Sequence, residues 1–137
     1  ITNKIVFDFT NALTVDSVIY HNQRATFLQQ ANKTLTISFP VEFGIGKLDS
    51  VTVYYQGVPP SSGDFTGGFT KTSHAGIPVI WTLSEPYGAS GWWPCRNGLN
   101  DKADSIDIYI THPSQYKASS NGILISRVTY GNSAISH

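Results

Sequence analysis

The chain of 137 residues has no methionine, a single cysteine and few charged side chains. Lysine, arginine, aspartate and glutamate make up 13% of the residues, and their formal charges sum to zero. Domains that bind nucleic acids or anionic membranes usually carry a basic patch, so this composition argues against both kinds of partner. No hydrophobic run approaches the roughly 20 residues that a membrane-spanning helix needs. One cysteine cannot form an internal disulfide, and we expect Cys95 to pack as a small apolar side chain.

Motifs that bind metals or supply a nucleophile are missing as well. The four histidines, His21, His74, His112 and His137, do not show the i, i+4 spacing of a helical zinc site. The chain contains neither a CxxC pair nor a DxDxDG loop, and it has no GxSxG nucleophile elbow. His74 is expected to be an ordinary loop histidine. We therefore predict no catalytic residue, no metal ligand and no cofactor in this chain.

The sequence is rich in segments where apolar and polar residues alternate. Near the N-terminus, for example, the alternation places Ile5, Phe7 and Phe9 on one face of an extended segment. No segment shows a sustained helical period. The pattern predicts an all-β protein, either an antiparallel β-sandwich or a saddle-like sheet with long loops and little or no helix, forming one domain over residues 1–137. The alternating runs, bounded by Gly, Asn and Pro, predict strands over residues 4–9, 15–20, 25–30, 34–39, 49–57, 78–84, 104–110 and 123–131.

Two stretches interrupt the alternation. Residues 56–76 are rich in Gly, Pro, Ser and Thr, which indicates a long ordered loop or a short hairpin. Residues 85–104 form the second stretch, and they begin with Glu85 and include the adjacent Trp92 and Trp93. Loops of this length inside a compact domain are usually functional or held by a partner. The second stretch is therefore the candidate functional site.

The sequence from Trp81 to Ala103, WTLSEPYGASGWWPCRNGLNDKA, resembles a block of zinc aminopeptidases of the aminopeptidase N family, which includes leukotriene hydrolase. In that family the block reads approximately TQ-x-E-P-x-x-A-R-x-x-F-P-C-x-D-x-P-x-x-K-A. Trp93 takes its aromatic position, and weaker similarity extends over most of the chain, as far as the SNG turn at residues 120–122. Eight residues match the block in register without a gap: Thr82, Glu85, Pro86, Ala89, Pro94, Cys95, Lys102 and Ala103.

The resemblance implies a β-domain from the N-terminal part of a larger enzyme. In the family, this domain packs over a separate thermolysin-like catalytic domain, which holds zinc through HExxH and a distal glutamate. The present sequence has no HExxH. The resemblance thus implies that the chain is most of an N-terminal domain, inactive by itself, with the zinc in the missing catalytic domain. Its expected partners are that catalytic domain and the N-terminus of a peptide substrate, and open strand edges would favour self-association if the chain is cut within its sheet.

By the same resemblance, Glu85 occupies the place of the acidic or amide residue that reaches the active site from the β-domain. An exopeptidase must recognise the α-ammonium group of its substrate, and a carboxylate offers that group a charge-assisted hydrogen bond. Pro86 restricts Glu85 to extended backbone and so directs its side chain. Tyr87, Trp92 and Trp93 are expected at the domain interface or the substrate cleft. Since neighbouring residues of an extended chain face opposite sides, we expect at most one tryptophan in the core and the other on an exposed apolar patch.

Several positions depart from the family block. Leu83 stands where the family usually has glutamine, which removes one of two expected polar contacts to substrate. Ser90 replaces an arginine, and Asn97 and Gly98 replace the usual acidic pair. These departures favour a divergent, bacterial branch and leave the substrate side-chain preference open. The sequence does not fix a compartment, although a secreted or periplasmic location is compatible with it.

Two other functions compete with the peptidase interpretation. A non-enzymatic β-sandwich module could bind carbohydrate or protein, with Tyr87, Trp92 and Trp93 as a stacking platform. A structural adhesion domain is the other alternative, since one fold hosts many functions. The registered spacing from Glu85 to Lys102 distinguishes the peptidase interpretation, because neither alternative requires it.

Overall fold

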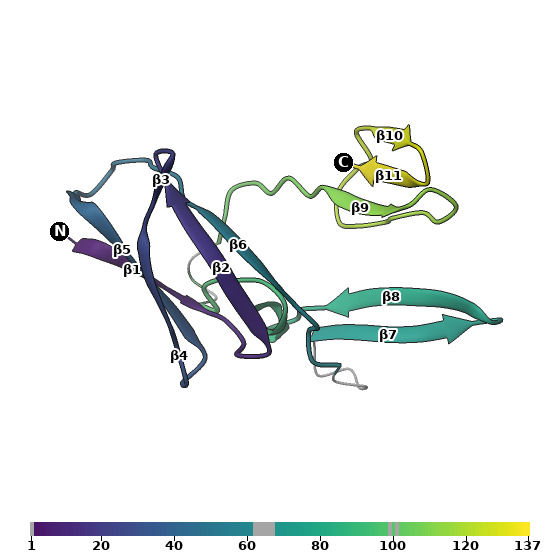
Figure 1. The fold of residues 1–137 in the computed structure, drawn as a ribbon, viewed down its shortest axis with the longest axis horizontal. Coiled ribbons are helices and arrows are strands. Elements are labelled where there is room, and N and C mark those ends of the chain that lie inside the picture. Colours follow the sequence, from purple (N-terminus) through teal and green to yellow (C-terminus); the bar gives the residue numbers. More distant parts are fainter. Residues whose placement is uncertain (1, 62–67, 99, 101) are drawn as a thin grey trace. The chain divides into compact units, whose positions relative to one another are not determined.

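The computed structural model describes residues 2–61, 68–98, 100 and 102–137, and they form an antiparallel all-β structure, as predicted (Figure 1). The chain divides into two compact units, Ile1–Leu99 and Asn100–His137. Within the ranges just given, no helix is long and apolar enough to cross a membrane. The elements are β1 (Thr2–Asp8), β2 (Leu13–Tyr20), β3 (Gln23–Arg24), β4 (Thr26–Gln30), β5 (Thr34–Phe43), β6 (Thr52–Gly57), β7 (Gly68–His74), β8 (Ile77–Leu83), the 3₁₀ turn η1 (Gly88–Gly91), β9 (Ile110–Pro113), β10 (Arg127–Tyr130) and β11 (Ser133–Ser136).

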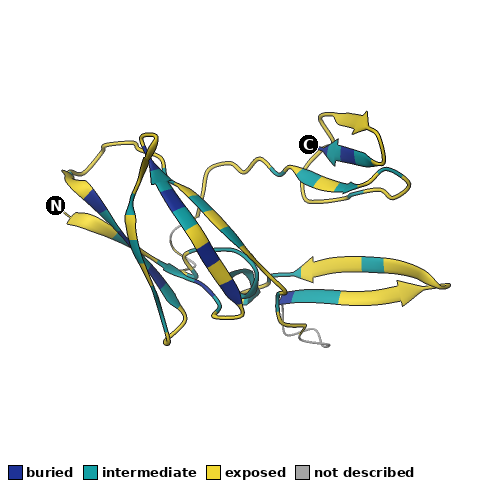
Figure 2. Cartoon of the chain, in the orientation of Figure 1, coloured by how far each residue is buried: buried dark blue, intermediate teal, exposed yellow. Residues whose placement is uncertain are grey.

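The unit Ile1–Leu99 contains two three-stranded sheets and a hairpin. Their strand orders are β1-β5-β4, β3-β2-β6 and β7-β8. The two larger sheets enclose a shared hydrophobic core, and its buried residues lie mainly on β2 and β5 (Figure 2). As the alternation predicted, Ile5 and Phe7 pack against this core and Phe9 is fully buried. The buried core residues are Phe9, Leu13, Val15, Val18, Tyr20, Leu35, Ile37 and Phe39.

A break in the alternation of β2 has a structural cause. Leu13 and Val15 are buried, but the next buried residues are Val18 and Tyr20, so the inward phase shifts by one residue. The pairing of β2 with β6 shifts register between Val15 and Ser17. An extra residue in one strand of an antiparallel pair returns the following side chains to the core face. The bulge therefore lets Leu13, Val15, Val18 and Tyr20 all face the core.

Gln29 on β4 connects the two larger sheets through polar contacts. Its Oε1 accepts a hydrogen bond from the Val15 backbone N–H at 3.3 Å. Its Nε2 donates to the carbonyl oxygens of Thr10 at 3.1 Å and Leu13 at 2.7 Å. Backbone groups near a core cost free energy when they have no partner. The side-chain amide thus bonds backbone groups at Thr10 and at the start of β2 and joins β4 to this segment.

The hairpin β7-β8 accounts for part of the first interrupted stretch. Ala75 and Gly76 form its two-residue turn, with φ values of 49° and 79°. Positive φ at both central residues gives the turn a twist that matches the twist of the paired strands. Of the two predicted alternatives for residues 56–76, the short hairpin is confirmed for residues 68–76, while residues 62–67 lie outside the described residues. The hairpin returns the chain through Leu83 to the candidate site.

The unit Asn100–His137 consists of one sheet with the order β10-β11-β9. The strands predicted over residues 104–110 and 123–131 form only in part, because β9 begins at Ile110 and β10 covers Arg127–Tyr130. Residues 105–109 and 123–126 lie outside the strands. An apolar alternation gives a segment the tendency to form a strand, but a ladder also requires a neighbour. The central strand β11 was not predicted, since its short SAIS sequence carries little β-propensity.

Candidate functional site

The loop that follows β8 is held at its far end by β1. Asp8 and Cys95 exchange two backbone hydrogen bonds, of 2.8 and 3.1 Å, and the Thr10 N–H donates to the Ser90 carbonyl at 2.9 Å. Asn97 adds two contacts, because its backbone N–H donates to Asp8 Oδ2 and its Nδ2 donates to Ser90 Oγ, both at 3.1 Å. Backbone and side chains together therefore fix this end of the loop to the edge of a core sheet.

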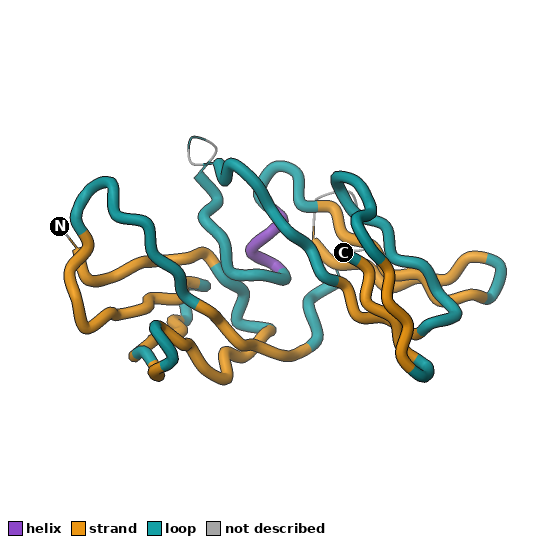
Figure 3. Tube along the Cα trace, turned by 90° about the horizontal axis from the view of Figure 1, so that it is seen from above, coloured by secondary structure: helices purple, strands orange, loops and turns teal. Residues whose placement is uncertain are grey.

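The near end of the loop is closed by its own hydrogen bonds. The Gly88 N–H donates to the Ser84 carbonyl at 3.0 Å, and the chain then forms the short turn η1, shown as the helical segment in Figure 3. The N–H groups of Trp92 and Trp93 both donate to the Ala89 carbonyl at 3.1 Å. Trp92 Nε1 donates to Ser84 Oγ at 3.1 Å, which joins the two ends of the turn. The residues between Ser84 and Gly88 are consequently presented on a braced turn.

Glu85 lies on this braced turn and is exposed. The peptide bond between Glu85 and Pro86 is cis, and Tyr87 is also exposed, at 54%. Among the described residues, the Glu85 carboxylate has no hydrogen-bond or ion-pair partner. A fixed backbone with an unpaired carboxylate can accept a hydrogen bond from an incoming cation without first breaking an internal contact.

Trp92 and Trp93 lie against each other, with ring centroids 6.0 Å apart and planes inclined by 42°. Both side chains are half-buried, so neither tryptophan is fully in the core. The prediction that one of the two lies on an exposed apolar patch is wrong, because the two rings shelter each other. The Trp93 indole N–H is buried without a hydrogen-bond partner in the part of the chain that the structure describes. Two half-buried, mutually tilted rings do not offer the flat exposed face that a carbohydrate platform needs.

Cys95 is half-buried, and the surrounding protein raises the pKa of its thiol to about 11. Burial is the larger cause, and the negative charge of Asp8 adds to it. The Sγ atom also donates to Asn97 Oδ1 at 3.3 Å. Since the thiolate is the reactive form, a raised pKa makes the thiol a poor nucleophile. Cys95 therefore serves in packing and in the brace at Asp8.

Alkylation should reveal this inert thiol directly. At pH 8 a pKa of about 11 leaves roughly 0.1% thiolate, whereas an ordinary cysteine has roughly a quarter. We expect iodoacetamide to modify Cys95 about a hundredfold more slowly in the folded chain than in the chain unfolded in urea, as measured by mass spectrometry over time. The folded rate should rise as the pH is raised toward 10. Equal rates for the folded and unfolded chains would contradict the assignment.

His21, His112 and His137 each contact a polar side chain. His21 Nε2 lies 2.9 Å from Asp49 Oδ1, and His112 Nε2 lies 2.9 Å from Ser136 Oγ, while His74 is exposed at the end of β7. Over the described residues, no group of three or more His, Cys, Asp or Glu side chains is placed to hold a metal ion. The residues that the structure describes therefore do not fit a zinc site.

Solved structures of M1 zinc metallopeptidases match the chain in fold. A two-domain M1 zinc metallopeptidase, in a mutant form bound to L-arginine, matches with a TM-score of 0.83 and 24% sequence identity over 98% of this chain. The M1 zinc metallopeptidase from Deinococcus radiodurans gives 0.84 and 24% over 98%, and a mutant of it bound to a Tyr-Ser-Ala substrate gives 0.83 and 22% over 98%. No protein-family model and no curated protein matches the chain.

The matches concern one part of these larger proteins. The chain spans 30% of the length of each matched structure, and the matching part is N-terminal. The chain thus has the fold of the N-terminal part of M1 zinc metallopeptidases, which are the aminopeptidase N family. The resemblance found in the sequence is confirmed at the level of the fold.

Proposed function

We propose that the chain is the N-terminal domain, or most of it, of a bacterial zinc aminopeptidase of the M1 family. Both compact units belong to this one domain, and the zinc and the catalytic groups lie in a part of the polypeptide outside this chain. One observation carries the proposal: Glu85 is exposed and unpartnered among the described residues, on a braced turn, and it falls in register with the family's E-P block. The fold match over 98% of the chain supports it.

The role proposed for Glu85 is recognition of the substrate's free amino group. At neutral pH a peptide N-terminus is largely an ammonium cation, and a carboxylate accepts a hydrogen bond from it with charge assistance. Such a contact positions the first residue of the peptide, and with it the bond to be cleaved. Tyr87 is exposed beside Glu85 and is proposed to contact the substrate or the catalytic domain, together with Trp92 and Trp93.

The activity test compares the 137-residue chain with a longer protein that contains it. We expect the 137-residue chain to show no turnover of leucine p-nitroanilide and to bind no stoichiometric zinc. The longer protein should cleave this substrate and should lose the activity on treatment with a chelator. Chelator-sensitive turnover by the 137-residue chain would contradict the proposal. Carbohydrate binding by a longer protein that lacks HExxH would instead favour a binding module.

A further inference from the structure

Two asparagines of the chain, Asn97 and Asn121, are each followed by glycine. An asparagine side chain can lose its amide nitrogen when the backbone nitrogen of the next residue attacks its Cγ atom. Glycine has no side chain to hinder that close approach. The sequence therefore places this reaction at Asn97 and Asn121, and it does not distinguish between them.

The reaction has two steps. In the first, a bond forms between the glycine nitrogen and Cγ while the bond from Cγ to Nδ2 breaks, and ammonia leaves with the proton of the glycine N–H. In the second, water opens the cyclic imide at either of its two carbonyl groups, which gives aspartate or isoaspartate. The first step requires the asparagine side chain to rotate until Cγ faces the nitrogen of the next residue.

The Asn97 side chain is held at both of its polar atoms. Nδ2 donates to Ser90 Oγ at 3.1 Å, and Oδ1 accepts from Cys95 Sγ at 3.3 Å. The raised pKa of Cys95 keeps its thiol protonated in mildly alkaline solution, so this donor persists there. The Asn97 backbone N–H is fixed as well, by Asp8 Oδ2 at 3.1 Å. Rotation of Cγ toward the Gly98 nitrogen therefore requires both side-chain hydrogen bonds to break.

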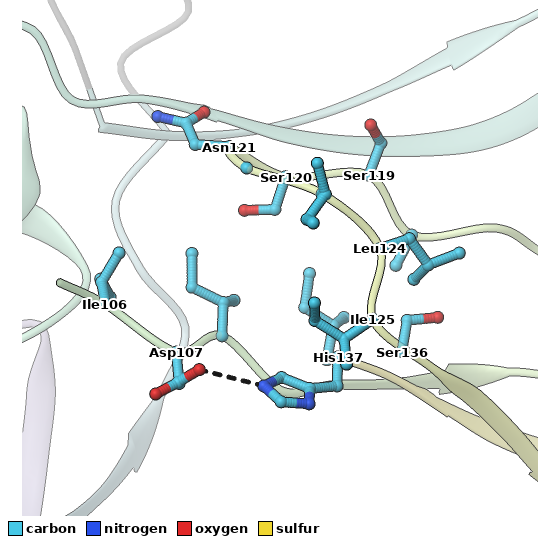
Figure 4. A pocket seen from close by; sticks show the side chains of 14 residues that line it. Ile106, Asp107, Ser119, Ser120, Asn121, Leu124, Ile125, Ser136 and His137 are labelled. Carbon is cyan, nitrogen blue, oxygen red and sulfur yellow. Dashed lines mark hydrogen bonds and ion pairs between the residues drawn. The ribbon is translucent and has the colours of Figure 1, made fainter.

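Asn121 has none of these restraints. It is exposed, and among the described residues neither its side chain nor the Gly122 N–H has a hydrogen-bond partner. Figure 4 shows the Asn121 amide directed away from Asp107 and His137. Steric access does not separate the two sites, since a Cβ atom added at Gly98 or Gly122 would meet no atom within 4 Å. The two sites thus differ in how the asparagine side chain is hydrogen-bonded.

We propose that Asn121 is a site of spontaneous covalent modification, at which the amide is converted to aspartate and isoaspartate, and that the contacts of Asn97 protect it from the same reaction. The two side-chain hydrogen bonds that must break slow the reaction of Asn97 by about thirtyfold relative to Asn121. Conversion of Asn121 adds one negative charge to a chain whose formal net charge is zero. Isoaspartate also routes the backbone through the side chain of the converted residue.

Protection of Asn97 preserves the loop that carries Glu85. Conversion of Asn97 would remove the Nδ2 donor to Ser90 and place a second carboxylate next to Asp8. Two neighbouring carboxylates disfavour each other's charged form. The contacts that fix the loop to β1 would consequently weaken. Asn121, in contrast, belongs to the unit Asn100–His137, which does not contain Glu85.

The test follows both asparagines in the folded 137-residue chain and in the same chain unfolded in urea. Samples are incubated in mildly alkaline buffer and digested with trypsin, which cuts after Arg96 and Lys117 and so separates the two sites. Tandem mass spectrometry then measures the conversion at each asparagine over time. In the folded chain we expect Asn121 to convert about thirtyfold faster than Asn97. In urea the contacts of Asn97 are lost, so the two rates should become similar.

Ser90→Ala tests the protection directly, because it removes the acceptor of Asn97 Nδ2 without adding bulk. This variant should speed the conversion of Asn97 by about fivefold and leave that of Asn121 unchanged. Ser73→Ala is the matched control and should change neither rate, since Ser73 is exposed on β7 and has no hydrogen bond to either asparagine.

Equal rates at Asn97 and Asn121 in the folded chain would overturn the inference. A difference in urea as large as that in the folded chain would do the same, because it would come from the sequence alone. An unchanged rate of Asn97 in Ser90→Ala would show that its contacts give no protection. No peptidase activity is measured, so the result does not depend on the proposed function.

Discussion

Substitution of Ile37 by alanine is expected to lower the free energy of unfolding of the Ile1–Leu99 unit by about 2–5 kcal/mol. Ile37 is fully buried, at 0% exposure, on β5, the central strand of the sheet β1-β5-β4. The loss combines the transfer of apolar groups with the cost of the cavity that remains. β5 is paired on both edges, with β1 and β4, so it has little freedom to move and close the cavity.

The measurement is urea unfolding followed by tryptophan fluorescence, because Trp81, Trp92 and Trp93 all lie in this unit. Ile80→Ala is the matched control. Ile80 lies on β8 and is 61% exposed, so the same chemical truncation there should cost less than about 1 kcal/mol. Equal losses in the two variants would show that Ile37 does not belong to a tightly packed core.

Substitution of Glu85 by glutamine in the longer enzyme is expected to lower kcat/KM by about ten- to a hundredfold on substrates with a free amino group. The change keeps the shape of the side chain and one acceptor oxygen but removes the charge. Hydrogen bonds to charged groups contribute about 1.5–3 kcal/mol, which corresponds to that range. Because Glu85 is exposed and has no internal partner among the described residues, the stability of the β-domain should stay within about 0.5 kcal/mol of the original.

Steady-state kinetics on matched free and N-blocked substrates separate recognition of the amine from other effects. N-blocked substrates should be poor for the original enzyme and little worse for the variant, since they carry no ammonium group. Glu42 is the only other glutamate of the chain and is exposed on β5, so Glu42→Gln serves as the control and should leave kcat/KM unchanged. If Glu85→Gln retains full efficiency on the free-amine substrate, Glu85 is only a solvated loop residue.

The candidate site shows how far local sequence could predict this protein. The spacing of Glu85, Pro86 and Cys95 within one block was sufficient to indicate the family's fold, which the structural matches confirm. Local sequence could not indicate that the loop is braced through Asp8, since that contact joins residues far apart in the chain. It also could not show that Trp92 and Trp93 shelter each other, because the short turn η1 interrupts the extended backbone that the prediction assumed.

The sequence by itself determined the strand character of most segments and the inward face of β5, where Leu35, Ile37 and Phe39 alternate into the core. The alternation of side chains between the two faces follows from the extended backbone of the strand itself, so it does not depend on which strand pairs with it. The tertiary structure alone decided where pairing begins and stops, as at the bulge after Val15 and at the start of β9 at Ile110. A ladder forms only where a second strand supplies donors and acceptors in register, and that strand comes from a distant part of the chain.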